Sequence, residues 1–495
     1  MNPTPEYPAD SRPNRTAQDI ALAALGVIFG LLVILTSTLL FSGRPAPPLL
    51  ATVLPATLLS TAVIGLLRPC WIFYSFIPIC MAFPHELEEF FLPLPFMKLY
   101  PQDVVFVFLI GVCIVRLLTN RSPSPLHSIP FNRYMYLYMM VGLVAAGIGL
   151  FVTGNSYSNV FGDLRRSFFY FLAYFFCIIL TRSESDIRHL TRALLIGATL
   201  AITRGLWQAT SGAFEARRFT DAAHVLNHFE ITFSTFAIYY GLTRLALRDR
   251  RFWWWIALVV AGILIVVLGN FRTCWVGFAA GLAVLVLFLP WHYRKKLLLA
   301  AITLGIIGSA ALALIWQVPV KQTHSTIGQN IAEKANISNI LSDTNITWRM
   351  DSYRNAMNLW EHNKLFGRGL GEHLEFATTT STGGAMMAMG HRVHNSYLWF
   401  LMSLGVVGLS IVAAIHCVFL RHVVTYLRFA NHAETQARML VLSCLALYVT
   451  ILVSACFDVY LESGPPITIL SVTMAIILLT ISATPPAPAP ATSIR

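Results

Sequence analysis

Charged residues are scarce in this chain. Only 12% of its 495 residues are Asp, Glu, Lys or Arg, whereas 56% are hydrophobic, and the mean hydropathy is +0.65. A soluble domain carries about 25% charged residues, so the composition excludes one. Apolar runs of about 20 residues recur from end to end, which is the length that a helix needs to cross a bilayer. Short alternating strands, which a membrane barrel would show, are absent from the sequence.

Closely spaced cysteine pairs are also missing. The eight cysteines lie in or beside apolar runs, and no C-x-x-C pair occurs. We therefore expect neither a zinc site nor a disulfide framework, and no cofactor is implied. The net charge of +12 would suggest a nucleic-acid partner in a soluble protein. In a membrane protein it indicates basic cytoplasmic loops next to anionic membrane lipids, so we expect no nucleic acid to bind.

The apolar runs predict an all-α fold: a polytopic transmembrane helical bundle of about 12–14 spans with one large, partly helical extracytoplasmic loop. A re-entrant segment is the alternative for the third run, which is short and interrupted by proline. The fourteen candidate spans are 20–41, 49–67, 69–83, 103–119, 134–153, 165–181, 189–209, 226–246, 252–270, 273–289, 297–316, 396–420, 438–457 and 466–483.

Basic residues of the short loops set the expected orientation. They gather on alternate loops, for example at Arg244, Arg248, Arg250 and Arg251, whereas the opposite loops carry acidic segments such as Asp458 and Glu462. We expect a bacterial inner-membrane protein with both termini in the cytoplasm. The predicted organisation is a disordered N-terminus (1–17), membrane helices 1–11 (18–316), a large periplasmic loop (317–395), membrane helices 12–14 (396–484) and a disordered Pro/Ala tail (485–495).

The loop 317–395 is the only long hydrophilic stretch. In residues 345–363 the apolar side chains recur every three to four positions, with polar side chains between them, which predicts an amphipathic helix. Residues 378–390 combine Thr, Ser, Gly, Ala and Met and are expected to be flexible, with methionines that could repack around an apolar ligand. An ordinary mobile loop is the alternative interpretation.

Several arginines lie near the outer boundary, against the orientation rule. They are Arg165 and Arg166 at the start of the sixth span, Arg217 and Arg218 in the next outer loop, Arg204 within span seven and Arg272 before span ten. A single one is explained by a side chain that reaches back to lipid headgroups. Several on one face favour an anionic ligand at membrane depth, because guanidinium binds phosphate through two hydrogen bonds without losing its charge. A lipid diphosphate carries its charge at this depth.

His394 lies where the large loop returns to the membrane. Histidine is the side chain best suited to accept a proton near neutral pH, and Asn395 could position a hydroxyl group beside it. His391 competes for the same role, and a purely structural histidine is the alternative interpretation.

The order of these motifs resembles the O-antigen ligase and O-antigen polymerase superfamily. The segment H-N-S-Y-L-W-F-L-M-S-L-G-V-V-G, from His394 to Gly408, is similar to its histidine signature. Residues 349–371 resemble its loop element, with Lys364 in place of a proline. The segment G-N-F-R-T-C-W resembles its S-R-x-x-W element, with Phe271 in place of serine. The resemblance covers roughly residues 160–460.

The resemblance implies a metal-independent, inverting glycosyltransferase at the outer face of the membrane. The donor would be a glycan linked to undecaprenyl diphosphate, and the acceptor a glycan or lipid A-core sugar hydroxyl. The resemblance implies His394 as the general base, and Arg217 or Arg218 together with Arg272 as the residues that hold the diphosphate. From their positions alone we add Asn395 to the catalytic residues and Arg165 and Arg166 to the diphosphate-binding residues. On the loop, or acceptor, side we place Arg349, Arg204 and His391.

Three alternatives remain open at this point. An O-antigen or exopolysaccharide polymerase would use the same donor chemistry with a different acceptor. A transporter of anions or lipid-linked sugars would use the arginines for passage, although no inverted repeat is visible. A non-catalytic scaffold would tolerate loss of the histidine and the arginines.

Overall fold

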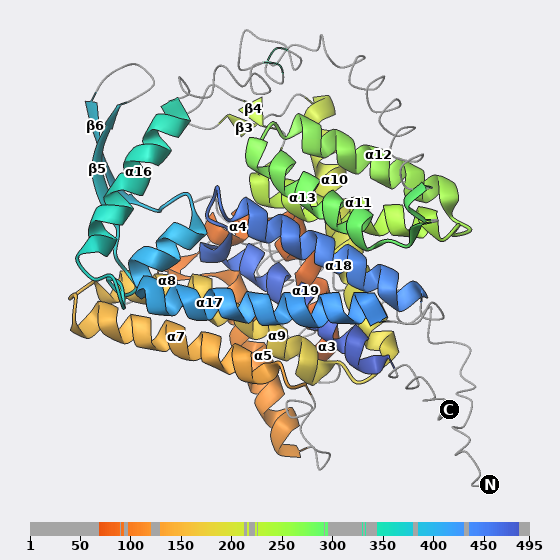
Figure 1. Ribbon diagram of the computed structural model, residues 1–495, viewed down its shortest axis with the longest axis horizontal. Coiled ribbons are helices and arrows are strands. Elements are labelled where there is room, and N and C mark those ends of the chain that lie inside the picture. The colour runs from red at the N-terminus through yellow and green to blue at the C-terminus, as the bar shows by residue number, and fades with distance from the viewer. Residues whose placement is uncertain are drawn as a thin grey trace, which may run out of the picture.

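Most of the residues that the computed structural model describes are helical (Figure 1). The structure describes residues 69–89, 91–93, 98–119, 129–211, 215–216, 223–224, 226–291, 293–295, 344–379, 385–429 and 435–484 and the single positions 329 and 332. The helices are α3 (Pro69–Ala82), α4 (Pro84–Glu89), α5 (Pro101–Thr119), α7 (Asn132–Phe151), α8 (Tyr157–Ser167), η1 (Phe169–Leu172), α9 (Ala173–Leu180), α10 (Glu184–Ser211), α11 (His228–Ala246), α12 (Phe252–Leu268), α13 (Arg272–Phe288), α16 (Thr344–Glu361), α17 (Ser396–Phe429), α18 (Thr435–Ser454), η4 (Tyr460–Glu462) and α19 (Gly464–Ala483). Three antiparallel strand pairs complete the described fold: β1 (Leu92–Pro93) with β2 (Lys98–Leu99), β3 (Glu215–Ala216) with β4 (Ala223–His224), and β5 (Leu374–Thr379) with β6 (Ala385–His391).

Five of the described helices are long and apolar enough to cross a membrane: α5, α7, α17, α18 and α19. Three shorter apolar helices, Cys70–Ala82, Phe252–Leu268 and Arg272–Phe288, accompany them. Large apolar side chains point outward from α5 and α7, for example Val107 and Val144. These findings confirm the all-α, polytopic membrane fold. The predicted spans 20–41, 49–67 and 297–316, most of the loop before α16 and both predicted disordered ends lie outside the described residues.

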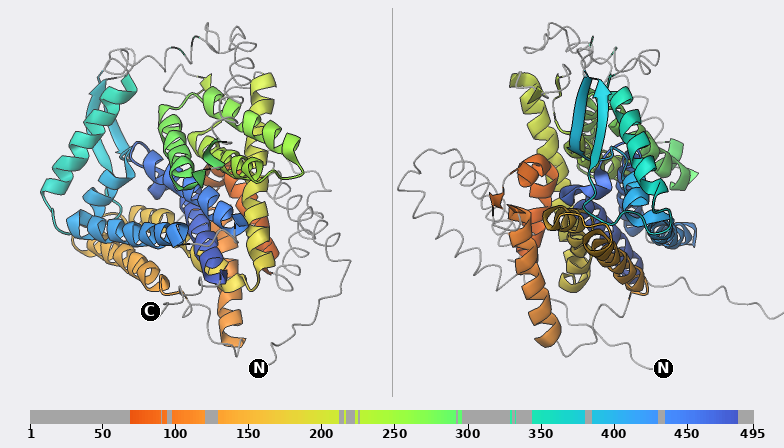
Figure 2. Two further views of the ribbon diagram at one scale, coloured as in Figure 1. Left: turned by 45° about the vertical axis from the view of Figure 1, so that its right-hand side comes forward. Right: turned by 90° about the vertical axis from the view of Figure 1, so that its left-hand side faces the viewer.

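Helix α19 forms the centre of the bundle and packs against α18, α9 and α10 (Figures 1 and 2). Nearly every side chain from Gly464 to Leu478 is buried. Its buried hydroxyl groups donate to the carbonyl four residues earlier, as Thr468 does to Gly464 at 2.9 Å and Ser471 to Ile467 at 2.7 Å. These bonds satisfy the hydroxyls within the helix itself, so a helix with several Ser and Thr residues can occupy an apolar core.

The sixth predicted span is not one continuous helix. A polar helix, α8, begins at Ser156, whose hydroxyl accepts from the backbone N–H of Asn159 at 3.3 Å. The backbone then leaves helical geometry at Phe168, tightens into η1 and continues as the eight-residue α9. A hydropathy window averages the hydropathy of the residues on both sides of such a bend. The sequence therefore predicted one continuous helix where the structure has the three segments α8, η1 and α9.

Helix α17 is broken at Gly405, and a loop segment fills the break. Gly405 has φ 66°, a value that favours glycine. The segment 364–371, called the glycine clasp here, bonds to the free backbone groups: Val406 N–H donates to Lys364 O at 2.9 Å, and Arg368 N–H donates to Met402 O at 2.8 Å. On its other side the clasp reaches α7, where Leu370 N–H donates to Ala145 O at 3.0 Å. The predicted twelfth span is therefore two helical pieces joined by this contact.

The described part of the large loop gathers at one end of the bundle, where Figure 1 shows α16 beside β5 and β6. The predicted amphipathic helix 345–363 is confirmed as α16. The expectation of a flexible 378–390 segment differs from the structure, because residues on both sides of 380–384 pair as β5 and β6. This hairpin packs on α16, with the rings of Trp348 and Phe376 centred 5.7 Å apart and Asn355 Nδ2 donating to Glu375 O at 3.1 Å.

Candidate active site

His394 and Asp458 form the core of the candidate site. His394 precedes α17, and Asp458 lies in the turn between α18 and η4. The Nδ1 of His394 lies 2.8 Å from Oδ1 of Asp458. A carboxylate accepts this hydrogen bond, so the proton of a neutral imidazole is on Nδ1 and Nε2 carries the lone pair. Nε2 has no hydrogen-bond partner among the residues that the structure describes, and the His394 side chain is 32% exposed.

Asp458 is shared by three basic side chains. Its other carboxylate oxygen, Oδ2, lies 3.7 Å from His228 Nε2 and 3.7 Å from a guanidinium nitrogen of Arg349. Burial alone would raise the pKa of Asp458. The nearby His228, His394 and Arg349 outweigh burial and hold the pKa of this carboxyl well below its ordinary value. The carboxylate is therefore ionised at neutral pH, and its permanently charged partner is Arg349.

Several contacts fix the position of His394. The Tyr353 hydroxyl of α16 donates to its carbonyl at 2.8 Å, and the Trp348 ring meets its imidazole edge-on at 4.9 Å. Next to it, Asn395 Oδ1 accepts from the N–H groups of Tyr397 and Leu398, both at 3.1 Å. Asn395 is thus a helix cap that sets the start of α17. The sequence prediction placed Asn395 with the catalytic residues; in the structure its oxygen serves the helix.

Arg272 is the first residue of α13, and its side chain is partly buried. The preceding Phe271 ring meets the His228 ring at 5.7 Å, so the start of α13 adjoins the Asp458 cluster. Arg349 reaches the same region from α16, where it also donates to the carbonyl of Phe457. Segments from α11, α13, α16, α17 and the turn after α18 therefore converge at Asp458.

Arg204 is held by two carboxylates. Its guanidinium lies 2.5 Å from Glu86 Oε1 and 2.7 Å from Glu230 Oε1, and it donates to the carbonyl of Ala82 at 2.9 Å. Glu230 in turn accepts from the backbone N–H of Asn227 at 2.9 Å as part of the capping box of α11. This predicted acceptor-side arginine thus ties α10 to α4 and α11.

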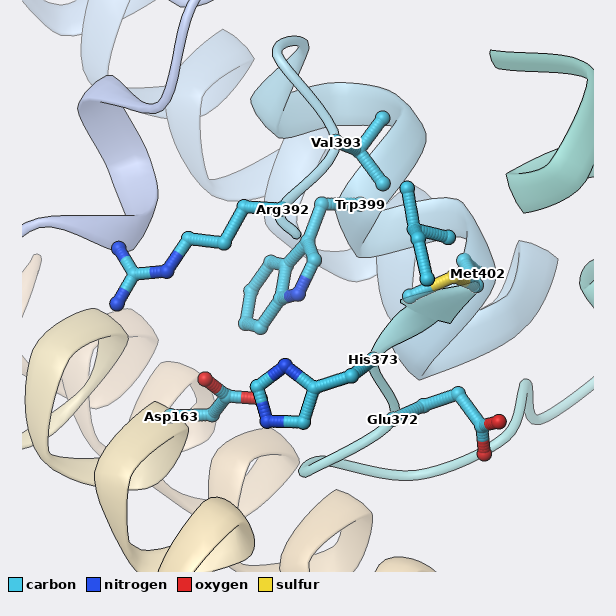
Figure 3. A pocket seen from close by; sticks show the side chains of 8 residues that line it. Asp163, Glu372, His373, Arg392, Val393, Trp399 and Met402 are labelled. Atoms are coloured by element: carbon cyan, nitrogen blue, oxygen red, sulfur yellow. The ribbon is translucent and has the colours of Figure 1, made fainter. Parts of the chain in front are cut away.

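Arg165 and Arg166, from the last turn of α8, line a cavity of about 380 Å³ together with Lys98, Tyr100 and Arg392. A narrow pocket of about 10 Å³ adjoins it and shares Asp163, His373 and Arg392 with it. In Figure 3 the His373 ring lies next to the Asp163 carboxylate, with Trp399 and Arg392 above them. Arg165 and Arg166 therefore line this cavity and are not among the basic residues that contact Asp458 in the described part of the chain.

Three other predicted site residues lie wholly or partly outside the described residues. Arg217 and Arg218 fall between β3 and β4, where no placement is described. His391 ends β6, where its backbone is paired with Leu374, and its side chain is not described. Within the described ranges, no group of three or more His, Cys, Asp or Glu side chains is arranged to hold a metal ion.

Sequence reasoning missed Asp458 and His228 as site residues. Asp458 entered only as an acidic marker of an outer loop, although it follows a span just as His394 precedes one, which places both at the same boundary. That shared boundary was a usable signal. His228 gave none, because its role depends on the packing of α11 against α13 and α18.

A comparison with known protein families includes several of these site residues in its match. Residues 256–413 match the family model described as O-antigen ligase. The matched stretch contains Arg272, Arg349 and His394, and it supports membership of the chain in the O-antigen ligase superfamily. A search of curated proteins finds no match to the chain.

Proposed function

On the premise that the chain is a membrane glycosyltransferase of the O-antigen ligase superfamily, we propose that it moves a glycan from a polyprenyl diphosphate, undecaprenyl diphosphate, to a sugar hydroxyl. The observation that carries this proposal is the His394–Asp458 pair. One imidazole nitrogen is held by a buried carboxylate, and the other is free to accept a proton.

His394 acts as the general base. The acceptor hydroxyl must lose a proton as its oxygen attacks the anomeric carbon, and Nε2 of His394 takes that proton. The Asp458 carboxylate holds the ring in the correct tautomer and stabilises the imidazolium that forms. The contacts from Tyr353 and Trp348 keep the ring in place, so little reorganisation is needed at the moment of reaction.

Arg272 and Arg349 stabilise the leaving diphosphate. Negative charge grows on the leaving oxygen as the glycosidic bond breaks, and fixed guanidinium groups can balance it. Arg349 also lies 3.7 Å from Asp458, so Arg272, which begins the neighbouring helix α13, is proposed to supply the charge that the Asp458 carboxylate does not balance. Arg217 and Arg218 are proposed to join them on the basis of sequence. A single displacement with one base predicts inversion at the anomeric carbon and requires no metal ion.

The site would face the periplasm of the bacterial inner membrane. Support comes from the basic short loops and from the position of His394 at the membrane end of the large loop. A polymerase would use the same residues on the same donor, because the two activities differ only in acceptor. We favour a ligase because the matched family is described as O-antigen ligase.

The test is the rate of transfer from undecaprenyl-diphosphate-linked glycan in membranes that contain equal amounts of each variant. His394→Ala is expected to lower kcat by about 10²–10⁴-fold, the usual contribution of a positioned base. The matched control is His362→Ala, because His362 is exposed just after α16 and, among the described residues, its ring is hydrogen-bonded to the carbonyl of Asn358 alone, at 2.7 Å. Wild-type kcat in His394→Ala would remove this residue from the mechanism.

A second pair of variants tests the arginines. Arg272→Ala is expected to slow transfer, whereas Arg354→Ala, at an exposed position on α16, is expected to leave the rate unchanged. Equal rates for the two variants would contradict the assignment of Arg272 to the diphosphate.

A further inference from the structure

The cavity beside α8 is polar and basic. Its volume is about 380 Å³, enough for one or two sugar rings, since ligand pockets begin at about 300 Å³. Lys98, Arg165, Arg166 and Arg392 line it, and among its lining residues only Phe161 and Gly162 lack a polar side-chain group. A prenyl chain requires apolar walls, whereas hydroxyl groups of a sugar require donors and acceptors such as Ser158 and Asn159.

Arg165 is fixed in place at the wall of the cavity. Its guanidinium lies 4.2 Å above the Tyr100 ring, 3.3 Å from Asp103 Oδ2 and 2.5 Å from the carbonyl oxygen of Lys98. These three contacts hold a positive charge in one position beside the cavity, so little side-chain entropy is lost when an anion binds there.

Basic side chains outnumber carboxylates in the lining of the cavity. Lys98, Arg165, Arg166 and Arg392 are basic, and Asp163 is the one lining carboxylate. Two of the four have carboxylate partners outside the lining, because Arg165 pairs with Asp103 and Glu88 lies near Arg166. Lys98 and Arg392 add positive charge to this wall, which suits the cavity to an anion.

One short segment connects the cavity with the candidate active site. Arg392 lines the cavity and donates to the carbonyl of Glu462 at 2.9 Å, while Asp458, four residues earlier, holds His394. Arg392 also stands two residues before His394, so the same short segment carries a cavity-lining guanidinium and the proposed base.

We propose that this cavity is the acceptor subsite and that it binds a phosphate or carboxylate group carried by the acceptor sugar or its neighbour. The proposal rests on the proposed function above and adds a substrate class to it: anionic acceptor glycans. Arg165 and Arg166 then hold the acceptor, and the donor diphosphate, which the sequence predicted for them, lies at Arg272 and Arg349.

The first measurement is the binding of small sugars to the full-length protein in detergent. Binding is detected as a rise in the temperature of thermal unfolding. Glucose 6-phosphate and glucuronate are expected to raise the unfolding temperature, whereas glucose and inorganic phosphate are not. Arg392→Gln should weaken glucose 6-phosphate binding about tenfold, the order expected when one charge-assisted hydrogen bond is lost. Lys98→Gln, at an exposed position, should weaken it less. Arg188→Gln removes an exposed cation paired with Glu184 on α10 and serves as the matched control.

The second measurement is the inhibition of transfer. Glucose 6-phosphate should compete with the acceptor and leave the KM of the donor unchanged. Competition with the donor alone would place the diphosphate in the cavity and overturn the proposal. Binding of inorganic phosphate as tight as that of glucose 6-phosphate, or a similar loss in Arg188→Gln, would overturn it as well.

The two proposals fail separately. His394→Ala should bind glucose 6-phosphate like the wild type while transferring little glycan. Binding without any transfer by the wild-type protein would contradict the proposed function, whereas transfer without preference for an anionic sugar would contradict the acceptor subsite alone.

Discussion

Two clusters of buried charge in this protein have opposite compositions. At Arg204 one guanidinium is shared by two carboxylates, Glu86 and Glu230. At Asp458 one carboxylate is shared by three basic groups, those of His394, His228 and Arg349. In the first cluster two carboxylates outnumber the one cation, whereas in the second a single carboxylate faces three basic groups, two of which are histidines that can take up a proton. We infer that the partners of an arginine separate a tie between helices from a candidate binding site, because Arg204 is enclosed by carboxylates whereas Arg349 is not.

The largest effect is expected from Asp458→Asn. The amide keeps the size of the side chain but removes the charge that orients His394 and stabilises its protonated form, so kcat should fall by about 10² or more. The measurement is kcat per folded molecule, with the amount of folded protein followed by size-exclusion chromatography in detergent. A variant with normal kcat would show that the carboxylate is only structural.

Arg204→Met tests the other cluster. Removing the shared cation leaves Glu86 and Glu230 without their partner, which should lower the stability by about 3–5 kcal/mol. We expect a lower unfolding temperature and a lower yield, but unchanged transfer per folded molecule. Adding Glu86→Gln and Glu230→Gln should restore part of the stability, because the unpaired charges are then gone. Normal folding combined with lost transfer would move Arg204 into the active site and break the comparison.

A smaller effect is expected from Arg349→Gln. The KM of the lipid-linked donor should rise about tenfold, with kcat less affected, because one of the groups proposed to hold the diphosphate loses its charge. Arg354→Gln on the same helix is the control, since its side chain is 75% exposed and its ion-pair partner within the described ranges is Asp351. If both variants changed the donor KM equally, the effect would be one of general surface charge.

Hydropathy predicted most of the described helices, because span length is set by the bilayer and is written locally in the sequence. The exceptions are places where tertiary bonds replace local ones. The bend at Phe168 and the break at Gly405 both interrupt apolar runs, and the second exists only because the glycine clasp supplies hydrogen bonds from elsewhere in the chain.

The candidate site could be predicted only in part for a related reason. His394 and Arg272 belong to recognisable local motifs. Asp458 is a single acidic residue in a short turn, and its significance depends on which side chains fold against it. The partners of Arg204 were equally hidden, because Glu86 and Glu230 come from two different segments of the chain.

The glycine clasp has a mechanical consequence for the outer loop. A lid that opens independently needs a hinge with few bonds to the body. Here the base of the loop is bonded to both α7 and the broken part of α17, and Gly367, Gly369 and Gly405 approach their neighbours too closely to admit a side chain. The clasp cannot leave this position without breaking its bonds to residues 402–407 of α17 and to Ala145 of α7, so the base of the loop and these two helices are held as one unit.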